Sequence, residues 1–407
     1  MSWKNLNSGA SALDYSAIIV GGGPAGISTW LHLQKYAPQL AESSIVIEKA
    51  IFPRDKLCGG GVCIWATDVL TKLKVDVLTS LKVDNNVPSL SVSDLEFRFG
   101  KEIDRLHQPN YFRFVKRQDF DHALAKAAVN RGLELHEDEM IIDLFRTQNN
   151  LMVTTNKGKY TVQVLVGGDG ALSTVRKKMM PFQKRHLAPT FQLIAPSDPD
   201  YDSEFNKRKT VVDLTPIKEG LQGYVWHVPC SNGKTDSIAH GIVDFRVWPD
   251  RPRPDMKKIF IRELRKRNIH QDPKTWSSHP IPWYSEDDIL SQPNVILVGD
   301  AAGIEPAFGG GIHLSLAYGE VAAQSIIDAF RTGDFSFQDY TQRIQSHQVG
   351  QHISKCTRIA RAMYGGKMNP LDGAREVFAP EPDSSTMMRE LLSRYLELHP
   401  QSSSDPE

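Results

Sequence analysis

The chain has 407 residues, 40% of them apolar and 24% charged, which is ordinary for globular proteins. Its 48 Lys and Arg residues balance 48 Asp and Glu residues, so charge predicts no nucleic-acid partner and no anionic membrane as a general partner. Four cysteines without a Cys-x-x-Cys pair predict neither a disulfide framework nor a metal site, and they favour a cytoplasmic location. We expect no signal peptide and no transmembrane segment, while contact with a membrane surface stays open.

The chain begins with the pattern of a β-α-β unit. Apolar strands are predicted at residues 16–20 and 44–48, with a helix from residue 25 to about residue 36 between them. Pro38 is expected to end that helix. Strand, helix and strand in this order are typical of a nucleotide-binding fold.

A glycine-rich turn joins the first strand to the helix and fits G-x-G-x-x-G. Its residues are Gly21, Gly22, Gly23, Pro24, Ala25 and Gly26. The first glycine of the pattern makes a tight turn, the second lets a pyrophosphate approach the backbone, and the third lets helix and strand pack closely. Glu48, at the end of the second strand, can accept hydrogen bonds from a ribose, and Lys49 next to it is included in the predicted site.

The middle of the chain repeats the nucleotide-fold pattern after a different segment. Residues 89–113 alternate between polar and apolar side chains, which predicts an antiparallel sheet with one polar face. A helix follows at residues 119–131, and a later apolar strand ends in Asp169-Gly170. That turn aims a carboxylate at the nucleotide crevice and places Arg176 within reach of a phosphate or of the same acid. An Asp-Gly pair is also a common turn and indicates little alone.

A larger insertion at residues 181–284 is strand-like again, except for a helix at residues 255–268. It contains a basic stretch that suits a diphosphate, an acidic carrier protein or reduced ferredoxin, or that is simply a solvated helix face. Its nine cations are Arg246, Arg251, Arg253, Lys257, Lys258, Arg262, Arg265, Lys266 and Arg267.

A third nucleotide-fold segment covers residues 294–329. Its strand ends in Gly299-Asp300, where a carboxylate can bond ribityl hydroxyls. The loop that opens the next helix includes Pro306, Gly309, Gly310, Gly311 and Ile312. Three glycines at a helix N-terminus form a flat surface rich in N–H donors, and the helix dipole favours the negative charge of a reduced flavin. A loop that merely starts a helix is the alternative. Three such sites imply a cofactor longer than NAD, namely FAD.

The three motifs in this order resemble the flavoprotein family with the p-hydroxybenzoate hydroxylase fold, over most of residues 15–330. The resemblance implies an α/β fold with a Rossmann-type FAD-binding domain of the GR2 type, an inserted, mostly antiparallel β substrate domain and a helical C-terminal region. The expected FAD-binding domain comprises residues 1–85, 113–180 and 285–332. The substrate-binding domain comprises residues 86–112 and 181–284, the helical region residues 333–400, and a disordered tail residues 401–407.

Two further segments resemble geranylgeranyl reductase-like proteins. The loop Arg54-Asp-Lys-Leu-Cys58-Gly59-Gly60-Gly61 is similar to their Arg-x-Lys-x-Cys-Gly-Gly-Gly segment. Tyr224-Val-Trp226-His-Val228-Pro229 is similar to their Tyr-x-Trp-x-Phe-Pro motif, with Val228 in place of Phe, a departure that bears on the shape of the lipid pocket. The resemblance implies that Arg54 reaches the phosphates or the ribityl chain, that the glycines pass close to the flavin ring, and that Arg117 is the second arginine near the flavin.

Three side chains are candidates for contact with the substrate. Cys58 is either a redox or substrate-contacting thiol, or a small buried residue in a tight loop. Tyr224 and Trp226 alternate on a strand and share one face, either lining the substrate pocket or belonging to the core. His227 then points to the opposite face and is interpreted as structural.

The leading hypothesis is a reductase or dehydrogenase that acts on C=C or C–H bonds of an apolar, possibly isoprenoid or carrier-bound substrate, with hydride transfer at flavin N5. Because no second dinucleotide turn is present, NAD(P)H must dock transiently or reduced ferredoxin must supply electrons. An NAD(P)H- and O₂-dependent aromatic hydroxylase is the first alternative. A flavin-dependent halogenase, whose W-x-W-x-I-P motif is missing, and a non-catalytic redox sensor are the others.

Overall fold

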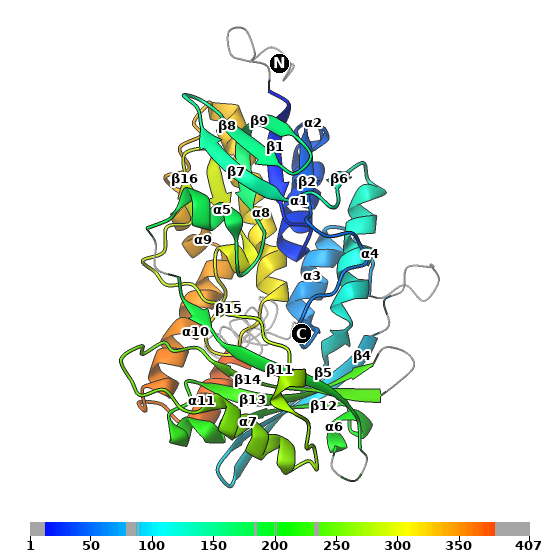
Figure 1. The fold of residues 1–407 in the computed structure, drawn as a ribbon, viewed down its shortest axis with the longest axis vertical. Coiled ribbons are helices and arrows are strands. Elements are labelled where there is room, and N and C mark those ends of the chain that lie inside the picture. Colours follow the sequence, from blue (N-terminus) through cyan, green and yellow to red (C-terminus); the bar gives the residue numbers. More distant parts are fainter. Residues whose placement is uncertain are drawn as a thin grey trace, which may run out of the picture.

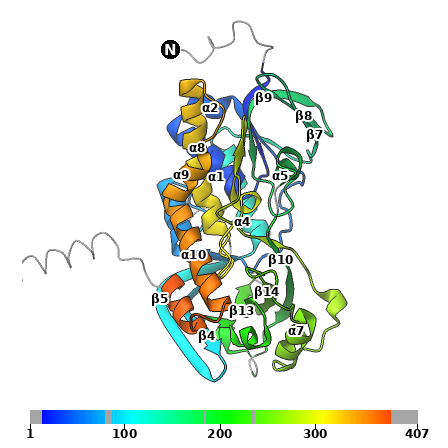
Figure 2. The same ribbon diagram turned by 90° about the vertical axis from the view of Figure 1, so that its left-hand side faces the viewer.

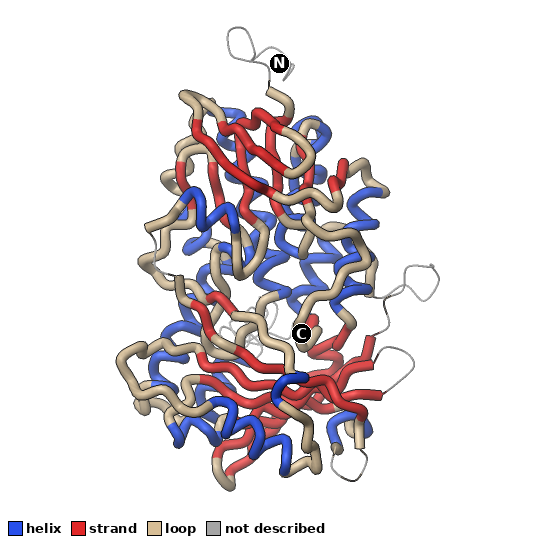
Figure 3. Tube along the Cα trace, in the orientation of Figure 1, coloured by secondary structure: helices blue, strands red, loops and turns tan. Residues whose placement is uncertain are grey.

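The computed structural model describes residues 13–78, 87, 89–182, 185–198, 200, 202–231 and 236–378. Two sheets occupy opposite ends of an elongated molecule, and helices lie between them (Figures 1 and 3). The predicted tail at residues 401–407 and the predicted helical region beyond residue 378 lie outside the described residues.

The first sheet has five parallel strands at its centre, in the order β17-β9-β1-β2-β6. Because helices or a hairpin cover both faces, its central strands are continuous apolar runs, as in parallel sheets generally. β16 pairs antiparallel with β17, and the β7–β8 hairpin extends from β9. The strands are β1 (Tyr15–Val20), β2 (Ser44–Ile47), β6 (Glu134–His136), β7 (Ile141–Arg146), β8 (Leu151–Thr155), β9 (Lys159–Gly167), β16 (Ser291–Gln292) and β17 (Val295–Leu297).

Two long helices, α1 (Pro24–Tyr36) and α8 (Ile312–Thr332), pack against each other on one side of this sheet. Figure 2 shows them on the side opposite to the β7–β8 hairpin and α5 (Thr174–Met179). Gly319 makes the close approach possible, because an added Cβ would lie 2.5 Å from Oγ of Ser28. The remaining helices near this sheet are α2 (Pro38–Glu42), α3 (Ile64–Lys72), α4 (Arg117–Val129) and α9 (Tyr340–Ser346).

The second sheet follows the order β11-β14-β13-β12-β4-β5-β3 and is antiparallel except for the pair β12–β4. β3 comes from the segment expected in the FAD-binding domain, yet it pairs with β5. The strands are β3 (Gly61–Cys63), β4 (Ser89–Phe99), β5 (Glu102–Val115), β11 (Thr190–Pro196), β12 (Lys209–Asp213), β13 (Gly223–Ser231) and β14 (Asp236–Asp244). A separate two-stranded pair joins β10 (Leu187–Ala188) and β15 (Ile281–Pro282).

Helices α10 (Gln348–Tyr364) and α11 (Pro370–Phe378) contribute to one apolar cluster with the second sheet. Ala307 and Phe308, from the loop that precedes α8, belong to the same cluster, so this loop lies where the two halves of the molecule meet. The short helices are α6 (Ser203–Asn206), α7 (Met256–Arg265) and the 3₁₀ turns at Thr215–Glu219, Pro273–Thr275 and Gly299–Ala301. No helix within the described ranges combines the length and the apolar character needed to cross a bilayer.

Candidate active site

Three glycine turns from distant parts of the sequence meet at the carboxyl ends of the first sheet's strands. Gly21 has φ +103°, and an added Cβ would lie 2.4 Å from the carbonyl oxygen of Gly168. The N–H of Gly168 donates to Val20 O at 2.8 Å. Gly299 lies as close to the first turn, because its added Cβ would be 2.6 Å from Cβ of Ala25. The three predicted motifs therefore lie next to one another.

The first turn leaves room for a ligand where the sequence predicts a pyrophosphate. An added Cβ at Gly26 would lie 2.0 Å from Gly21 O, which explains the third glycine of the pattern. At Gly23 an added Cβ would meet only Nη2 of Arg54 within 4 Å, at 3.6 Å. Pro24 and Ala25 then begin α1, whose first N–H groups have no acceptor within the helix. An open turn with a helix N-terminus and a guanidinium beside it fits a diphosphate.

A buried carboxylate holds the two predicted arginines together. Asp121 Oδ1 and Oδ2 accept from Arg117 Nε at 2.8 Å and Nη2 at 3.0 Å, and Oδ2 also accepts from Arg54 Nη1 at 3.1 Å. Arg54 Nε lies 3.3 Å from Glu48 Oε2, which also accepts the N–H of Gly22 at 2.9 Å. Burial opposes the charge on Arg117, but Asp121 outweighs it and raises the pKa of Arg117. Sequence reasoning did not find Asp121.

Glu48 has the geometry expected of a ribose ligand, whereas Lys49 does not join the cluster. Each oxygen of Glu48 accepts one backbone N–H, from Gly22 and from Ala50, which leaves lone pairs for hydroxyl groups. The side chain of Lys49 is exposed.

The second turn differs from the expectation in its charged contacts. Asp169 accepts the hydroxyl of Ser173 at 2.5 Å and the N–H groups of Thr174 and Val175, so it caps α5. Burial raises the pKa of Asp169. The ion pair of Arg176 is with Asp288, at 2.7 Å. Arg176 also donates to the carbonyl groups of Ala301 and Ala302, and thereby ties the second turn to the third. Gly170, with φ +81°, completes the turn.

The Cys58–Gly61 loop lies between the two sheets. Gly60 has φ +78° and passes so close to Val115 that an added Cβ would be 2.0 Å from its carbonyl oxygen. An added Cβ at Gly59 would be 3.6 Å from Cγ2 of Val228, and one at Gly61 3.2 Å from the ring of Phe114. Cys58 is half-buried, and its Sγ accepts the N–H of Gly60 at 3.3 Å. The loop therefore contacts the strand that carries the Tyr224–Pro229 motif.

Tyr224 and Trp226 share one face of β13, as predicted. The hydroxyl of Tyr224 donates to the carbonyl of Phe308, and burial raises the pKa of Tyr224, which keeps it a donor. The indole of Trp226 covers Gly241, where an added Cβ would be only 2.0 Å from the ring. His227 is buried on the other face, 2.8 Å from His240 between their Nδ1 atoms. Burial lowers the pKa of both imidazoles, that of His240 to about 3.

The loop before α8 is less rich in free donors than its glycines suggest. Glu305, which the sequence did not single out, accepts the N–H groups of Ala307, Phe308 and Gly310 at 2.6, 2.9 and 2.7 Å. The predicted donor-rich surface therefore lacks the N–H group of Gly310, which is bonded to Glu305. Asp300 Oδ1 lies 3.6 Å from an added Cβ at Gly311, so this acid faces the start of α8 at Ile312. Pro306 and Gly309 complete the loop. The sequence signal that could have identified Glu305 is an acidic residue next to a proline in a glycine-rich loop.

Most cations of the basic stretch are engaged within the fold. Arg246 and Arg251 bond backbone carbonyls, Arg262 and Lys266 pair with Glu219 or Glu263, and Arg267 pairs with Asp202 and Glu204 in a buried cluster. Arg253, Lys257, Lys258 and Arg265 are exposed. Seven of the nine cations are exposed, including Arg251, Arg262 and Lys266, which agrees with a solvated face, whereas Arg246 is half-buried and Arg267 is buried.

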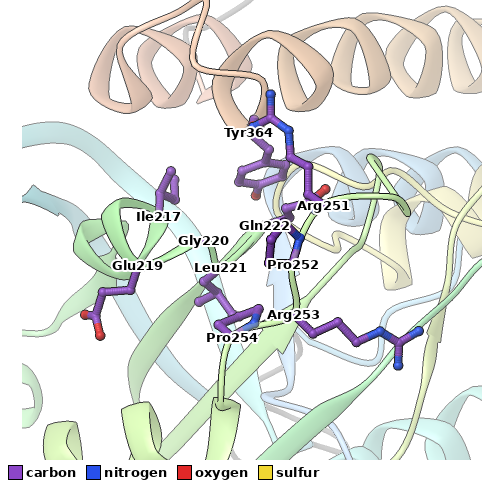
Figure 4. Close-up of a pocket in the computed structure, with 10 residues that line it drawn as sticks. All are labelled: Ile217, Glu219, Gly220, Leu221, Gln222, Arg251, Pro252, Arg253, Pro254 and Tyr364. Carbon is purple, nitrogen blue, oxygen red and sulfur yellow. The ribbon is translucent and has the colours of Figure 1, made fainter.

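A cavity of about 300 Å³ is lined by none of the predicted FAD-binding or substrate-contacting residues, although it includes Arg251 and Arg253 of the basic stretch. It is lined by Ile217, Glu219, Gly220, Leu221, Gln222, Arg251, Pro252, Arg253, Pro254 and Tyr364 (Figure 4). Arg251 extends toward the end of α10, where it donates to the carbonyl groups of Tyr364 and Gly365.

Comparisons with known proteins identify chains of similar sequence. The chain is 24% identical over 358 residues to an uncharacterized protein of Methanosarcina barkeri, covering 86% of this chain and 84% of that protein. It is 25% identical over 339 residues to a digeranylgeranylglycerophospholipid reductase of Methanosarcina acetivorans, covering 80% and 78%.

Solved structures share the fold. A geranylgeranyl bacteriochlorophyll reductase-like protein from Thermoplasma acidophilum has a TM-score of 0.63 at 18% identity, covering 95% of this chain and 97% of that one. The halogenase PltM has a TM-score of 0.68 at 15% identity, covering 95% and 84%. The sequence pattern of one family, described as FAD binding domain, matches residues 14–317. The chain therefore belongs to the FAD binding domain family and is an FAD-dependent oxidoreductase.

Proposed function

We propose that this oxidoreductase reduces C=C bonds, or dehydrogenates C–C bonds, of an apolar isoprenoid or carrier-bound substrate. The observation that carries the proposal is the contact between the two reductase-like segments, where Gly59 lies against Val228 and Tyr224 bonds Phe308 in the glycine loop. The relative named digeranylgeranylglycerophospholipid reductase supports the same substrate class.

In this proposal the chain holds FAD with residues from both halves of the molecule. The Gly21–Gly26 turn and Arg54 bind the diphosphate, Glu48 the ribose, Asp300 the ribityl chain and the Gly309–Gly311 loop the ring. Arg117, the Asp169-Gly170 turn, Arg176 and the Cys58–Gly61 loop support these contacts. We also propose the division into FAD-binding and substrate-binding domains given above, with β3 assigned to the second sheet.

When bound and reduced, FAD would supply a hydride to one alkene carbon while solvent supplies a proton to the other; a hydride from NAD(P)H, or two molecules of reduced ferredoxin and a proton, would restore the reduced flavin. The chain positions the substrate and excludes water. Tyr224 and Trp226 present aromatic surface to an apolar chain, while Tyr224 also fixes the glycine loop through Phe308. Cys58, half-buried between the sheets, contacts the substrate without a redox step of its own.

Four exposed cations of the basic stretch form no ion pair within the described residues and suit an acidic electron donor or carrier protein, namely Arg253, Lys257, Lys258 and Arg265. If ferredoxin docks there, replacing Lys258 and Arg265 by Glu lowers the rate of flavin reduction by ferredoxin and reduces its dependence on salt. Reduction by dithionite serves as the control, because this small donor requires no docking surface.

The competing candidate is an aromatic hydroxylase of the same fold, and the likeness to PltM concerns the fold alone. Anaerobic photoreduction of the FAD-loaded protein separates these functions. Reoxidation by an isoprenoid alkene, with a product heavier by two hydrogen atoms, is the expected result. Reoxidation only by O₂, with oxygen incorporated into an aromatic product, would instead identify a hydroxylase. A protein that turns over with no acceptor would be a redox sensor.

A further inference from the structure

Glu305 is a buried carboxylate in the loop that is proposed to carry the flavin ring. Its exposed fraction is 2%, and it lies between the Gly299-Asp300 turn and the glycines that precede α8. Oε2 accepts the N–H groups of Ala307 and Phe308, and Oε1 accepts those of Phe308 and Gly310. The function proposed above gives no role to this side chain.

The hydrogen bonds of Glu305 favour its ionised form. Every partner bonded to the two oxygens is an N–H donor. A protonated carboxyl would place its O–H group next to one of these donors, and the hydrogen bond at that oxygen would be lost. Burial raises the pKa of Glu305 above its usual range, and the backbone N–H groups oppose that effect only in part. The N-terminus of α8, a helix of 21 residues, lies directly after this loop and also favours a negative charge.

Two tyrosines fix the same loop without contributing charge. Tyr224 from the second sheet donates to Phe308 O, and Tyr364 from α10 donates to Ala307 O at 2.7 Å. Glu305 differs from them because it places a charge next to the Gly309–Gly311 platform, the segment proposed to carry the flavin ring. Its Oε1 lies 3.5 Å from an added Cβ at Gly310. Its effect on a bound ring can therefore be separated from that of loop geometry.

We infer that Glu305 is a positioning residue that shapes the Gly309–Gly311 platform and whose negative charge lowers the reduction potential of the bound flavin. A reduced flavin carries more negative charge than an oxidised one, so a nearby carboxylate disfavours reduction. Glu305 thus offsets part of the stabilisation from the α8 dipole. A lower reduction potential makes the reduced flavin a stronger hydride donor, which suits the reduction of an isolated C=C bond. This inference rests on the proposed binding of FAD at this loop.

The test is the midpoint potential of the FAD-loaded protein, measured with a redox dye and no substrate. Glu305→Gln removes the charge and keeps the size, and we expect at least a tenfold shift of the two-electron equilibrium toward reduced flavin, or about 30 mV upward. Glu305→Asp keeps the charge, and Tyr364→Phe loosens the loop without changing charge. Both should stay closer to the wild-type potential than Glu305→Gln does.

An unchanged or lowered potential in Glu305→Gln would overturn the inference, as would equal shifts in all three variants. If Glu305→Gln does not bind FAD, the inference is tested instead with the infrared difference spectrum between the oxidised and the reduced wild-type protein. A carboxylate band that changes on flavin reduction and moves in Glu305→Asp supports the inference, and its absence rejects it. Failure of the wild type itself to bind FAD would reject the proposed function, whereas a bound flavin that reduces no alkene leaves this test intact.

Discussion

Gly23 has a conformation that any residue can adopt, so a glycine there is explained by space. An added Cβ meets only Arg54, at 3.6 Å, and the open volume is where the diphosphate is proposed to lie. We expect Gly23→Trp to abolish FAD binding by filling that volume, and Gly23→Ala to weaken it less. Flavin absorbance per chain measures occupancy, and circular dichroism verifies the fold. Full occupancy in Gly23→Trp would refute the assignment of this turn.

Asp121 is the residue whose loss disturbs two arginines at once. In Asp121→Asn, Arg117 stays buried without a counter-charge, which typically costs about 3 kcal/mol of unfolding free energy. Arg54 also loses its anchor near Gly23, so FAD affinity should fall. Denaturant unfolding of the apoprotein and fluorescence titration with FAD measure the two effects.

The matched control is Asp119→Asn, on the same turn of α4, whose carboxylate has no ion pair among the described residues. It should change neither quantity by a comparable amount. Wild-type affinity and stability in Asp121→Asn would show that the two arginines hold their positions without this carboxylate.

At the scale of elements, strands and helices with clear periodicity were predictable, and their charged contacts were not. The central strands of the first sheet and helix α1 match the predicted unit, because buried parallel strands are continuous apolar runs. The helix expected at residues 255–268 is shorter, Met256–Arg265, with Asp255 as its N-cap. Arg176 pairs with Asp288, which lies 112 residues further on, and no local pattern specifies such a partner.

Glu96 joins three strands of the second sheet and gives this element a pH dependence. Burial opposes its ionisation, but hydrogen bonds from Arg98, Lys209 and Arg105 outweigh burial and lower the pKa of Glu96 to about 2. A carboxylate with a lowered pKa stabilises the fold above its unfolded pKa, about 4.5, and this contribution is lost as pH falls toward 2. The shift corresponds to at most about 3 kcal/mol at neutral pH, reduced by solvent screening of the exposed Arg105.

We therefore expect Glu96→Gln to be less stable than the wild type at pH 7 and nearly equal to it near pH 2, where about half of the wild-type carboxyl is protonated and its contribution is almost lost. Urea unfolding at several pH values measures the difference. If the difference in unfolding free energy between the wild type and Glu96→Gln stayed constant from pH 7 to pH 2, the charge of Glu96 would not be the source of this stability.

At the scale of the whole molecule, the order of the three motifs predicted the convergence of the turns, because the carboxyl ends of parallel strands share one edge of a sheet. The contacts between the two sheets were not predictable. Lys56 lies 3.3 Å from His279, and Tyr224 bonds Phe308, although each pair is far apart in the sequence. Such pairs depend on how surfaces built from separate segments of the chain meet.

Because the proposed FAD site takes residues from three segments of the first sheet and from the loop that Tyr224 holds, the cofactor should stabilise both halves of the molecule together. A ligand that binds only the folded state adds about 2.7 kcal/mol at a concentration 100 times its dissociation constant. Removing FAD should therefore lower the unfolding temperature, and adding it back should raise that temperature with the logarithm of concentration. FMN, which lacks the adenosine and the diphosphate, is the matched control and should restore little. An unfolding temperature independent of FAD, or equal recovery with FMN, would mean that the Gly21–Gly26 turn and the Gly309–Gly311 loop do not bind the same ligand.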